Sequence, residues 1–203
     1  MSRVCVNAKT INSNSNEYYF EIPKESKVSD KMYHQAINAH KDLWGDFYNL
    51  AGQPTVKVLV AEDDWEIDSW WRHLYKAHPF TAGIAKLKAN TYYDWHIDTD
   101  RGVRVNMLLN NWDTSHCMFN PNMKRGESDY NIQLADLKQG EREFVELKYT
   151  PQRYYLFNTQ VAHTIYNFNE PRYLLTLDFD EDITNLTYKQ LLEELIRERW
   201  WEK

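Results

Sequence analysis

The sequence has few cysteines and no long hydrophobic run. Cys5 and Cys117 are its only 2 cysteines, and their spacing is typical of neither a disulfide framework nor a zinc site. The longest apolar stretches, residues 58–61 and 174–177, are far shorter than the roughly 20 residues that a helix needs to cross a membrane. We therefore expect a cytoplasmic protein, in a reducing compartment, without a membrane span.

Positive charge and small residues are also scarce. The 24 Lys and Arg are outnumbered by 30 Asp and Glu, which gives a formal net charge of -6. Such a charge repels phosphate backbones and anionic membrane surfaces, so neither is an expected partner. Glycine and proline number 6 each against 14 tyrosines and 8 tryptophans, so aromatic rings are expected to fill much of the core.

Hydrophobic periodicity predicts helices toward both ends and strands in the middle. A polar arm, 1–17, precedes an N-terminal part, 18–80, with a strand at 18–22 and helices over about 29–44 and 63–75. Residues 181–203 hold a predicted helix at 188–201, which begins with the capping-box pattern of Thr187 and Gln190. Between them, 81–180 is predicted to form strands at 83–93, 103–109, 144–149, 153–157, 161–167 and 172–180, with 110–140 as a long irregular excursion.

This order of elements favours a mainly β fold with flanking helices. No alternation of strand and helix is visible in the middle, which argues against a parallel sheet of the Rossmann type. A continuous antiparallel middle between helical ends favours a barrel or sandwich buttressed by the N-terminal and C-terminal helices. A chain of 203 residues with 42% apolar residues is expected to form one domain, 1–203.

Two histidines and an aspartate are candidate metal ligands. His96 and Asp98 are two residues apart, so on an extended segment both side chains leave the same face. His163 lies on a separate predicted strand, and two imidazoles with one carboxylate suit iron(II) with positions left open. Parity alone leaves Asp94 as an alternative to Asp98, and a surface histidine beside an aspartate is a common arrangement without function.

Arg172 is a candidate anion-binding residue. It opens a strand after the turn at 167–171, so it could share an interior with His163. A buried guanidinium requires an anion, and its fork fits a carboxylate. The alternative is an arginine that reaches solvent at the strand end or pairs with a glutamate.

Arg104 and Asn106 share one face of the strand predicted at 103–109. Val103, Val105 and Met107 form the opposite, apolar face. If both faces are buried, the two polar side chains must line a polar interior, because a buried polar group needs a partner. If the second face is solvated, they are ordinary surface residues.

This set of residues resembles the iron(II)/2-oxoglutarate oxygenase superfamily. The likeness consists of the H-x-D pair, the distal His163 and Arg172 nine residues beyond it, and it covers about residues 80–180. The segment 163–178, HTIYNFNEPRYLLTLD, is most similar to the aspartyl/asparaginyl β-hydroxylase-type branch, with its metal histidine, an asparagine four residues on, and an arginine that opens an apolar strand ending in aspartate. The segment 103–108 is similar to the family strand in which an arginine and a polar residue two later point inward, although the family often has histidine where Asn106 stands.

The resemblance implies a fold, a ligand set and an activity. The fold would be a double-stranded β-helix, a jelly roll of the cupin kind. Iron(II) would bind His96, Asp98 and His163, which are the catalytic site, and 2-oxoglutarate would bind Arg172 with Arg104 and Asn106 nearby. With dioxygen, the enzyme would hydroxylate an amino-acid side chain, free or peptidyl, and convert 2-oxoglutarate to succinate. A cupin-type hydrolase or isomerase and a non-catalytic jelly-roll binding domain are the alternatives.

Overall fold

The computed structural model describes residues 17–50, 53–59, 68–123 and 144–203, so most of the predicted N-terminal arm lies outside the described residues. Its strands are β1 (Tyr19–Glu25), β2 (Gly45–Leu50), β3 (Gln53–Leu59), β4 (Phe80–Leu87), β5 (Thr91–His96), β6 (Val103–Leu108), β7 (Ser115–Asn120), β8 (Val145–Leu147), β9 (Arg153–Asn158), β10 (Ala162–Asn167) and β11 (Arg172–Phe179). Its helices are α2 (Ser29–Asn38), α3 (Trp70–Ala77) and α4 (Tyr188–Glu198), with short 3-10 helices η2 (Lys41–Leu43) and η4 (Trp200–Glu202).

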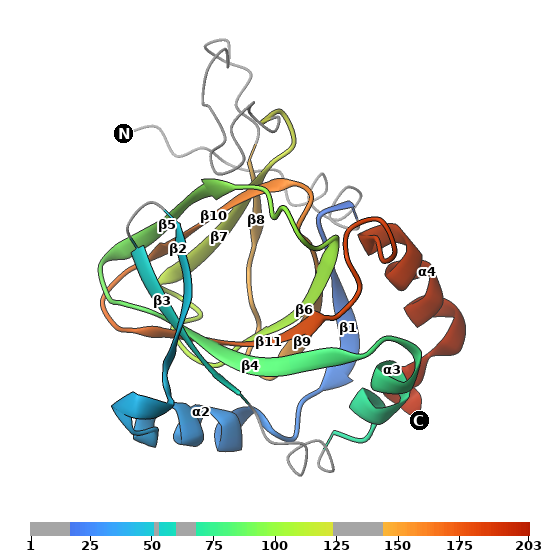
Figure 1. Cartoon of the computed structure of the whole chain (residues 1–203), viewed down its shortest axis with the longest axis horizontal. Helices are drawn as coiled ribbons and strands as arrows, with labels where there is room; N and C mark the ends of the chain where they lie inside the picture. Colours follow the sequence, from blue (N-terminus) through green and yellow to red (C-terminus); the bar gives the residue numbers. More distant parts are fainter. Residues whose placement is uncertain (1–16, 51–52, 60–67, 124–143) are drawn as a thin grey trace.

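The strands form two antiparallel sheets. The larger sheet has the order β1-β9-β6-β11-β4-β3-β2, and the smaller has the order β5-β10-β7-β8. Figure 1 shows the strands of both sheets arranged around a common interior, with the helices outside. The predicted class, mainly β with flanking helices, is confirmed, and the arrangement is that of a double-stranded β-helix.

At β6 and β11 both faces of the larger sheet are buried, and each face has its own hydrophobic cluster. On β6, Val103, Val105 and Met107 belong to the cluster that lies between the sheet and the helices. Leu108 belongs to a second cluster, which also contains Phe119 of the smaller sheet and therefore fills the space between the sheets. Because side chains alternate along a strand, Arg104 and Asn106 must face that interior.

The helices cover the outer face of the larger sheet. In α2 and α4 the buried residues recur at helical spacing, with Met32 and Ala36 in α2 and Leu191 and Leu195 in α4. The predicted capping box is confirmed, because the Thr187 hydroxyl accepts from the backbone of Gln190 and the Gln190 side chain accepts from the backbone of Thr187. The helices therefore bury one stripe each and leave the interior of the barrel to the strands.

Several predicted boundaries are wrong. The strand predicted at 83–93 is two strands in different sheets, β4 and β5, because the chain turns at Asn90 with a left-handed φ of 53°. The first helix ends at Asn38 instead of continuing to residue 44, and the hairpin of β2 and β3 follows it. The helix predicted at 63–75 begins at Trp70, and residues 63–67 lie outside the described residues.

The predicted excursion at 110–140 contains a strand of the smaller sheet. β7 pairs with both β10 and β8, so it lies in the interior of that sheet. Its residues alternate in burial, with Cys117 and Phe119 buried and His116 and Met118 partly exposed between them. This period of two identifies a strand, but polar residues at both ends of the segment obscure it.

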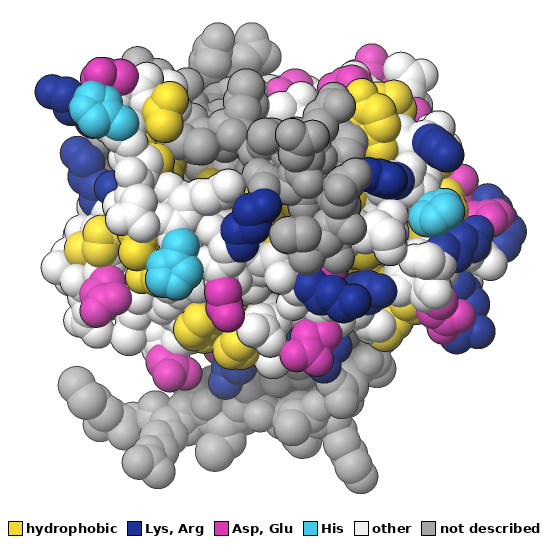
Figure 2. All heavy atoms as spheres, turned by 90° about the horizontal axis from the view of Figure 1, so that it is seen from below, with side chains coloured by type: hydrophobic (Ala, Val, Ile, Leu, Met, Phe, Trp, Pro, Cys, Tyr) yellow, Lys and Arg dark blue, Asp and Glu magenta, His cyan; other side chains and the backbone are white. Residues whose placement is uncertain are grey.

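The described part of the chain contains no candidate membrane helix, and one face of it carries charges of both signs. No helix there is both long and apolar enough to cross a membrane. Figure 2 shows one face of the molecule on which Lys and Arg side chains are interspersed with Asp and Glu side chains. That face therefore offers no extended positive field for a polyanion.

Candidate metal centre

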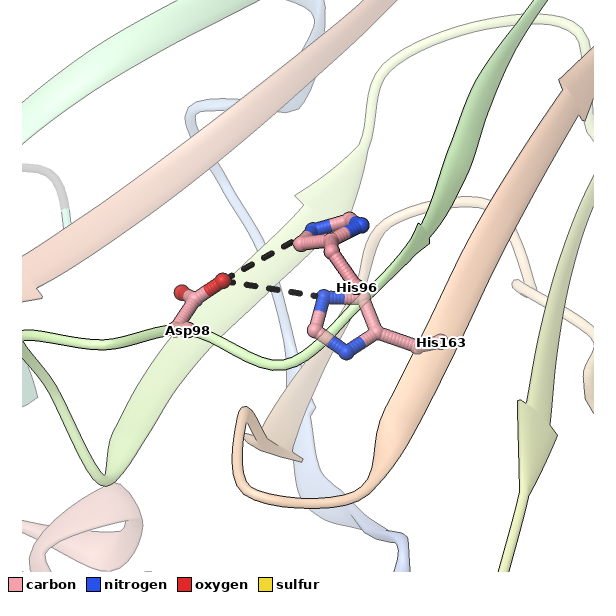
Figure 3. Close-up of side chains that lie close together, drawn as sticks. All are labelled: His96, Asp98 and His163. Atoms are coloured by element: carbon pink, nitrogen blue, oxygen red, sulfur yellow. Dashed lines mark ion pairs between the residues drawn. The ribbon is translucent and has the colours of Figure 1, made fainter. Parts of the chain in front are cut away.

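His96, Asp98 and His163 converge inside the barrel. His96 ends β5 and is paired in register with His163 on the neighbouring β10, so the two imidazoles share the inner face of the smaller sheet. Their ring centroids are 4.1 Å apart, and Asp98 Oδ1 lies 3.6 Å from Nε2 of His96 and 3.9 Å from Nε2 of His163 (Figure 3). One ligand atom from each residue lies within 4.8 Å of the others, a spacing that a single metal ion could bridge.

A bulge in β5 decides between the two aspartates. Ile165 of β10 pairs with Tyr93 while His163 pairs with His96, so β5 holds one extra residue between these pairs. The extra residue removes Asp94 from the parity of His96, and the Asp94 carboxylate accepts a hydrogen bond from the backbone of Trp95 instead. Only Asp98 reaches the histidines among the described residues.

The turn between β9 and β10 fixes the backbone of Asp98. The Asp98 N–H donates to Thr159 O at 3.1 Å, and the Gln160 side chain donates to Asp98 O at 3.0 Å. Since His163 follows the same turn, the segments that carry Asp98 and His163 are linked directly. These contacts position the backbone of Asp98 relative to the strand that carries His163.

Both imidazoles present Nε2 to the centre of the cluster. Nδ1 of His96 lies 2.7 Å from Asp94 O, and Nδ1 of His163 lies 2.9 Å from Val161 O. A carbonyl oxygen can only accept, so Nδ1 carries the proton and donates in each case. Nε2 is then unprotonated in the neutral ring and is free to bind a metal.

The electrostatics of the cluster keep the histidines neutral and the aspartate charged. Burial lowers the pKa of His163 to about 3, with repulsion from His96 as the next cause. Burial also lowers the pKa of His96. Burial of Asp98 opposes ionisation, but attraction to positive charge, first that of Arg104 and also that of Arg101, outweighs it and lowers the pKa of the carboxyl group. These are the protonation states that metal ligands need.

Arg172 lies in the barrel interior with no anionic partner among the described residues. It is buried, its Nε has no hydrogen-bond partner, and its guanidinium carbon lies 5.8 Å from the centre of the Tyr149 ring. Asn106 is within hydrogen-bonding reach of the same tyrosine. A desolvated guanidinium without a counterion is costly, so the site is suited to a bound anion.

Other buried polar atoms on the same face lack partners. Arg172 and Thr176 are four residues apart on β11 and share its inner face, and Thr176 pairs in register with Asn106 of β6. Thr176 Oγ1 and Asn106 Oδ1 are buried, and neither has a hydrogen-bond partner within the part of the chain that the structure describes. Together with Arg172 they offer hydroxyl and amide groups beside a cation, which fits a small, polar, anionic ligand.

Arg104 and Asn106 are separated in the interior. Asn106 lies beside Tyr149, whereas Arg104 reaches the candidate ligand Asp98 at 3.8 Å and Asp178 at 2.7 Å. The predicted contact of Arg104 with a co-substrate therefore stays a prediction, because the structure shows this arginine between two carboxylates.

Several interior residues were not predicted from the sequence, although the alternation of side chains along β11 indicates two of them. Thr176 and Asp178 share the parity of Arg172 on β11, so the face of Arg172 could have predicted both. Arg101, which contacts Asp98, follows it by three residues in a loop and has no periodic signal. Cys117 points inward, where burial raises the pKa of its thiol to about 12, while His116 contacts Glu146.

Comparisons with known proteins support the fold. No family model and no curated protein sequence matches the chain. Among solved structures, a prolyl-4-hydroxylase of Pseudomonas putida is similar over 84% of this chain and 96% of its own, with 11% identity and a TM-score of 0.56. The epimerase SnoN of nogalamycin biosynthesis, in complex with Fe3+ and α-ketoglutarate, is similar over 84% and 82%, with 9% identity and a TM-score of 0.56. The carbocyclase SnoK of the same biosynthesis is similar over 88% and 86%, with 10% identity and a TM-score of 0.50.

These likenesses extend over most of both chains in each pair, and at such low identity they concern the fold. SnoN and SnoK are both described as α-ketoglutarate dependent. The double-stranded β-helix with flanking helices is thereby confirmed.

Proposed function

We propose that this chain is an iron(II)- and 2-oxoglutarate-dependent oxygenase. The observation that carries the proposal is the presence of two complementary sites in one barrel interior. One is a His-Asp-His cluster, and the other is the buried Arg172 without a counterion. A metal site alone would suit many reactions, whereas a metal site that shares its interior with an unpaired guanidinium suits a metal-chelating acid with a second carboxylate.

Each residue then has a role in binding. His96, Asp98 and His163 hold the iron through Nε2, Oδ1 and Nε2, which is the facial set that leaves positions open. Arg172 binds the distal carboxylate of 2-oxoglutarate, and Thr176 and Asn106 donate or accept hydrogen bonds beside it. When bound, the iron supplies the oxidative chemistry by which dioxygen converts 2-oxoglutarate to succinate and oxidises a C–H bond. The protein supplies orientation and a dry interior.

We further propose that the reaction is hydroxylation of an amino-acid side chain, free or peptidyl. The support is the resemblance of residues 163–178 to the aspartyl/asparaginyl β-hydroxylase-type branch. Among the proteins of similar fold, one is a prolyl-4-hydroxylase. The other two are described as an epimerase and a carbocyclase, so the likeness in fold does not itself favour hydroxylation.

A turnover screen tests the proposal. The chain is loaded with iron(II), supplied with 2-oxoglutarate and dioxygen, and mixed with amino acids and short peptides, and succinate is measured. We expect succinate to rise with one class of substrate and the product to carry one oxygen atom from labelled dioxygen.

Two variants test whether succinate formation depends on the His-Asp-His cluster. His163→Ala should abolish succinate formation, whereas His116→Ala should retain it, because His116 contacts Glu146 on the partly exposed side of β7. Equal succinate formation in the wild type and in a folded His163→Ala variant would refute the proposal. Substrate-dependent succinate without oxygen in the product would refute hydroxylation while leaving the oxygenase family intact.

A further inference from the structure

The two oxygens of the Asp98 carboxylate face different groups. Oδ1 faces Nε2 of the two histidines, at 3.6 and 3.9 Å. Oδ2 faces Nε of Arg101 at 3.2 Å and Nη2 of Arg104 at 3.8 Å. The carboxylate is nearly buried, with 10% of its side chain exposed. One oxygen is thus directed to the histidines, while the other forms ion pairs with two arginines.

Asp178 closes these contacts into a ring. Its Oδ1 lies 3.1 Å from Nη1 of Arg101 and 2.7 Å from Nε of Arg104. The order Asp98, Arg101, Asp178, Arg104 and back to Asp98 alternates in charge, so the ring of four side chains is neutral. Both arginines are mostly buried; Arg104 contacts two carboxylates, and Arg101 contacts three, because its Nε and Nη2 also donate to the Asp100 carboxylate at 2.9 Å each.

The backbone of Arg101 is fixed from outside the ring. Its carbonyl oxygen accepts from the Thr159 hydroxyl at 2.7 Å and from the Gln160 side chain at 2.6 Å. The next residue, Gly102, forms a bridge with Thr187, and a Cβ at Gly102 would lie 2.4 Å from Leu186 O. Only glycine allows this approach, so the segment ahead of α4 anchors the loop that carries Arg101.

We propose that Arg101, Arg104 and Asp178 are positioning residues that fix Asp98 as a one-oxygen metal ligand. The inference rests on the proposed metal site and concerns its geometry. If both oxygens of Asp98 bound the ion, one of the open positions needed for co-substrate and dioxygen would be filled. By holding Oδ2, the two arginines leave Oδ1 as the single oxygen available to the ion.

Coulomb interactions and positioning predict opposite results for the arginines. An arginine repels a divalent cation, so its removal should strengthen metal binding if charge alone matters. If the arginine holds Asp98 in place, its removal should weaken metal binding, typically about tenfold to a hundredfold for a residue that orients a ligand. The sign of the change therefore separates the two accounts.

Titration of the metal-free full chain with cobalt(II) alone is the test. We expect Arg101→Gln to bind cobalt(II) about tenfold to a hundredfold more weakly, and its visible cobalt spectrum to change because the second oxygen can coordinate. Arg153→Gln is the matched control, since Arg153 begins β9 and pairs with Glu21 far from the cluster, and it should bind as the wild type does. Unchanged or tighter binding by Arg101→Gln would overturn the proposal.

Two further variants keep the test decisive if Arg101→Gln does not fold. Arg101→Lys keeps the charge, but one ammonium cannot reach Asp98 and Asp178 in the same geometry, so weaker binding is expected. Asp178→Asn should also weaken binding, whereas Asp180→Asn, an exposed aspartate at the end of the same strand, should not. Wild-type affinity and spectrum in both Arg101→Lys and Asp178→Asn would overturn the proposal.

His163→Ala separates this proposal from the proposed function. Loss of cobalt(II) binding in His163→Ala together with wild-type binding in Arg101→Gln would refute the positioning role alone. Wild-type binding in His163→Ala would refute the metal site itself.

Discussion

The two ends of the barrel interior differ in how their charges are paired. The metal end consists of the cluster and its ring: His96, Asp98, His163, Arg101, Arg104 and Asp178. Its arginines and carboxylates contact one another at 2.7 to 3.8 Å. The Arg172 end consists of Arg172, Asn106, Thr176 and Tyr149, and among the described residues it contains no carboxylate.

This difference indicates what each end needs from outside the protein. At the metal end the arginines are paired with carboxylates of the protein, which leaves Nε2 of the two histidines and Oδ1 of Asp98 facing one another, a set that suits a cation. The Arg172 end has a buried positive charge that none of the described residues neutralises, so it is suited to an anion from outside. A single molecule that chelates the metal and carries a distal carboxylate would satisfy both.

Removal of a ligand should have the largest effect. Asp98→Ala takes the only carboxylate from the set and should reduce iron(II) affinity more than about a hundredfold, beyond the usual effect of residues that only orient ligands. Asp94→Ala should bind iron(II) normally, because its carboxylate contacts the backbone of Trp95. Isothermal titration under argon measures both. Normal iron binding in Asp98→Ala would contradict the proposal that this end of the interior binds iron through Asp98.

Removal of the unpaired charge should affect only the other end. Arg172→Ala should weaken 2-oxoglutarate binding by about 2 to 5 kcal/mol, a few tens to a few thousand fold, because one member of a desolvated pair is lost. Arg172→Lys should recover part of the loss, since an ammonium lacks the guanidinium fork. Iron affinity without 2-oxoglutarate should not change. Wild-type 2-oxoglutarate affinity in Arg172→Ala would place the anion site elsewhere, with Arg104 as the next residue to test.

The metal end should also make the stability of the metal-free chain depend on pH. His163 has a pKa of about 3 in the folded, metal-free chain and an ordinary value of 6.5 when unfolded. Between these values the unfolded state binds the extra proton, so stability should fall as pH falls from about 6.5 toward 4, by up to about 1.4 kcal/mol per pH unit for this histidine.

Denaturant unfolding of the metal-free chain across that range measures the slope. His96, whose pKa is also lowered, adds to it with the same sign. His163→Asn should flatten the slope, because it removes one of the two histidines that titrate only in the unfolded state. A slope equal to that of the wild type would contradict the burial that defines the metal end.

The smallest effect is expected at Thr176. Its hydroxyl has no partner in the barrel, so Thr176→Val should leave the stability of the empty chain unchanged or slightly raised. The same change should weaken 2-oxoglutarate binding by about 0.5 to 1.5 kcal/mol, roughly twofold to tenfold. Thr164→Val is a contrast, because the Thr164 hydroxyl donates to Tyr93 O and its loss should cost stability instead. Equal 2-oxoglutarate affinity in Thr176→Val and wild type would contradict a hydrogen bond between Thr176 and 2-oxoglutarate.

The sequence predicts residues at both ends of the barrel interior, but it does not predict the contacts between segments that are far apart in the chain. His163 and Arg172 could be predicted because a histidine and an arginine flank one turn between two clear strands. Asp98 could not be separated from Asp94 by parity, since the bulge that separates them depends on pairing with β10. Arg101 and Asp178 are 77 residues apart, and only the folded chain brings them together.

The errors in the predicted strand boundaries have the same physical origin. β7 has the alternation of a strand, but the polar residues at its ends are typical of a loop. Its pairing with β8 and β10 is what identifies it as a strand. The turn at Asn90 separates two strands that have the same periodic pattern, and periodicity does not register a local change of direction. Long-range pairing, which a single sequence does not display, decides both features.

Anaerobic addition of 2-oxoglutarate to the iron(II)-loaded chain tests most directly whether one molecule occupies both ends. We expect a weak visible charge-transfer band that is absent in His163→Ala and that requires much more 2-oxoglutarate in Arg172→Ala. A folded, iron(II)-loaded wild-type chain that shows no such band at saturating 2-oxoglutarate would contradict the account.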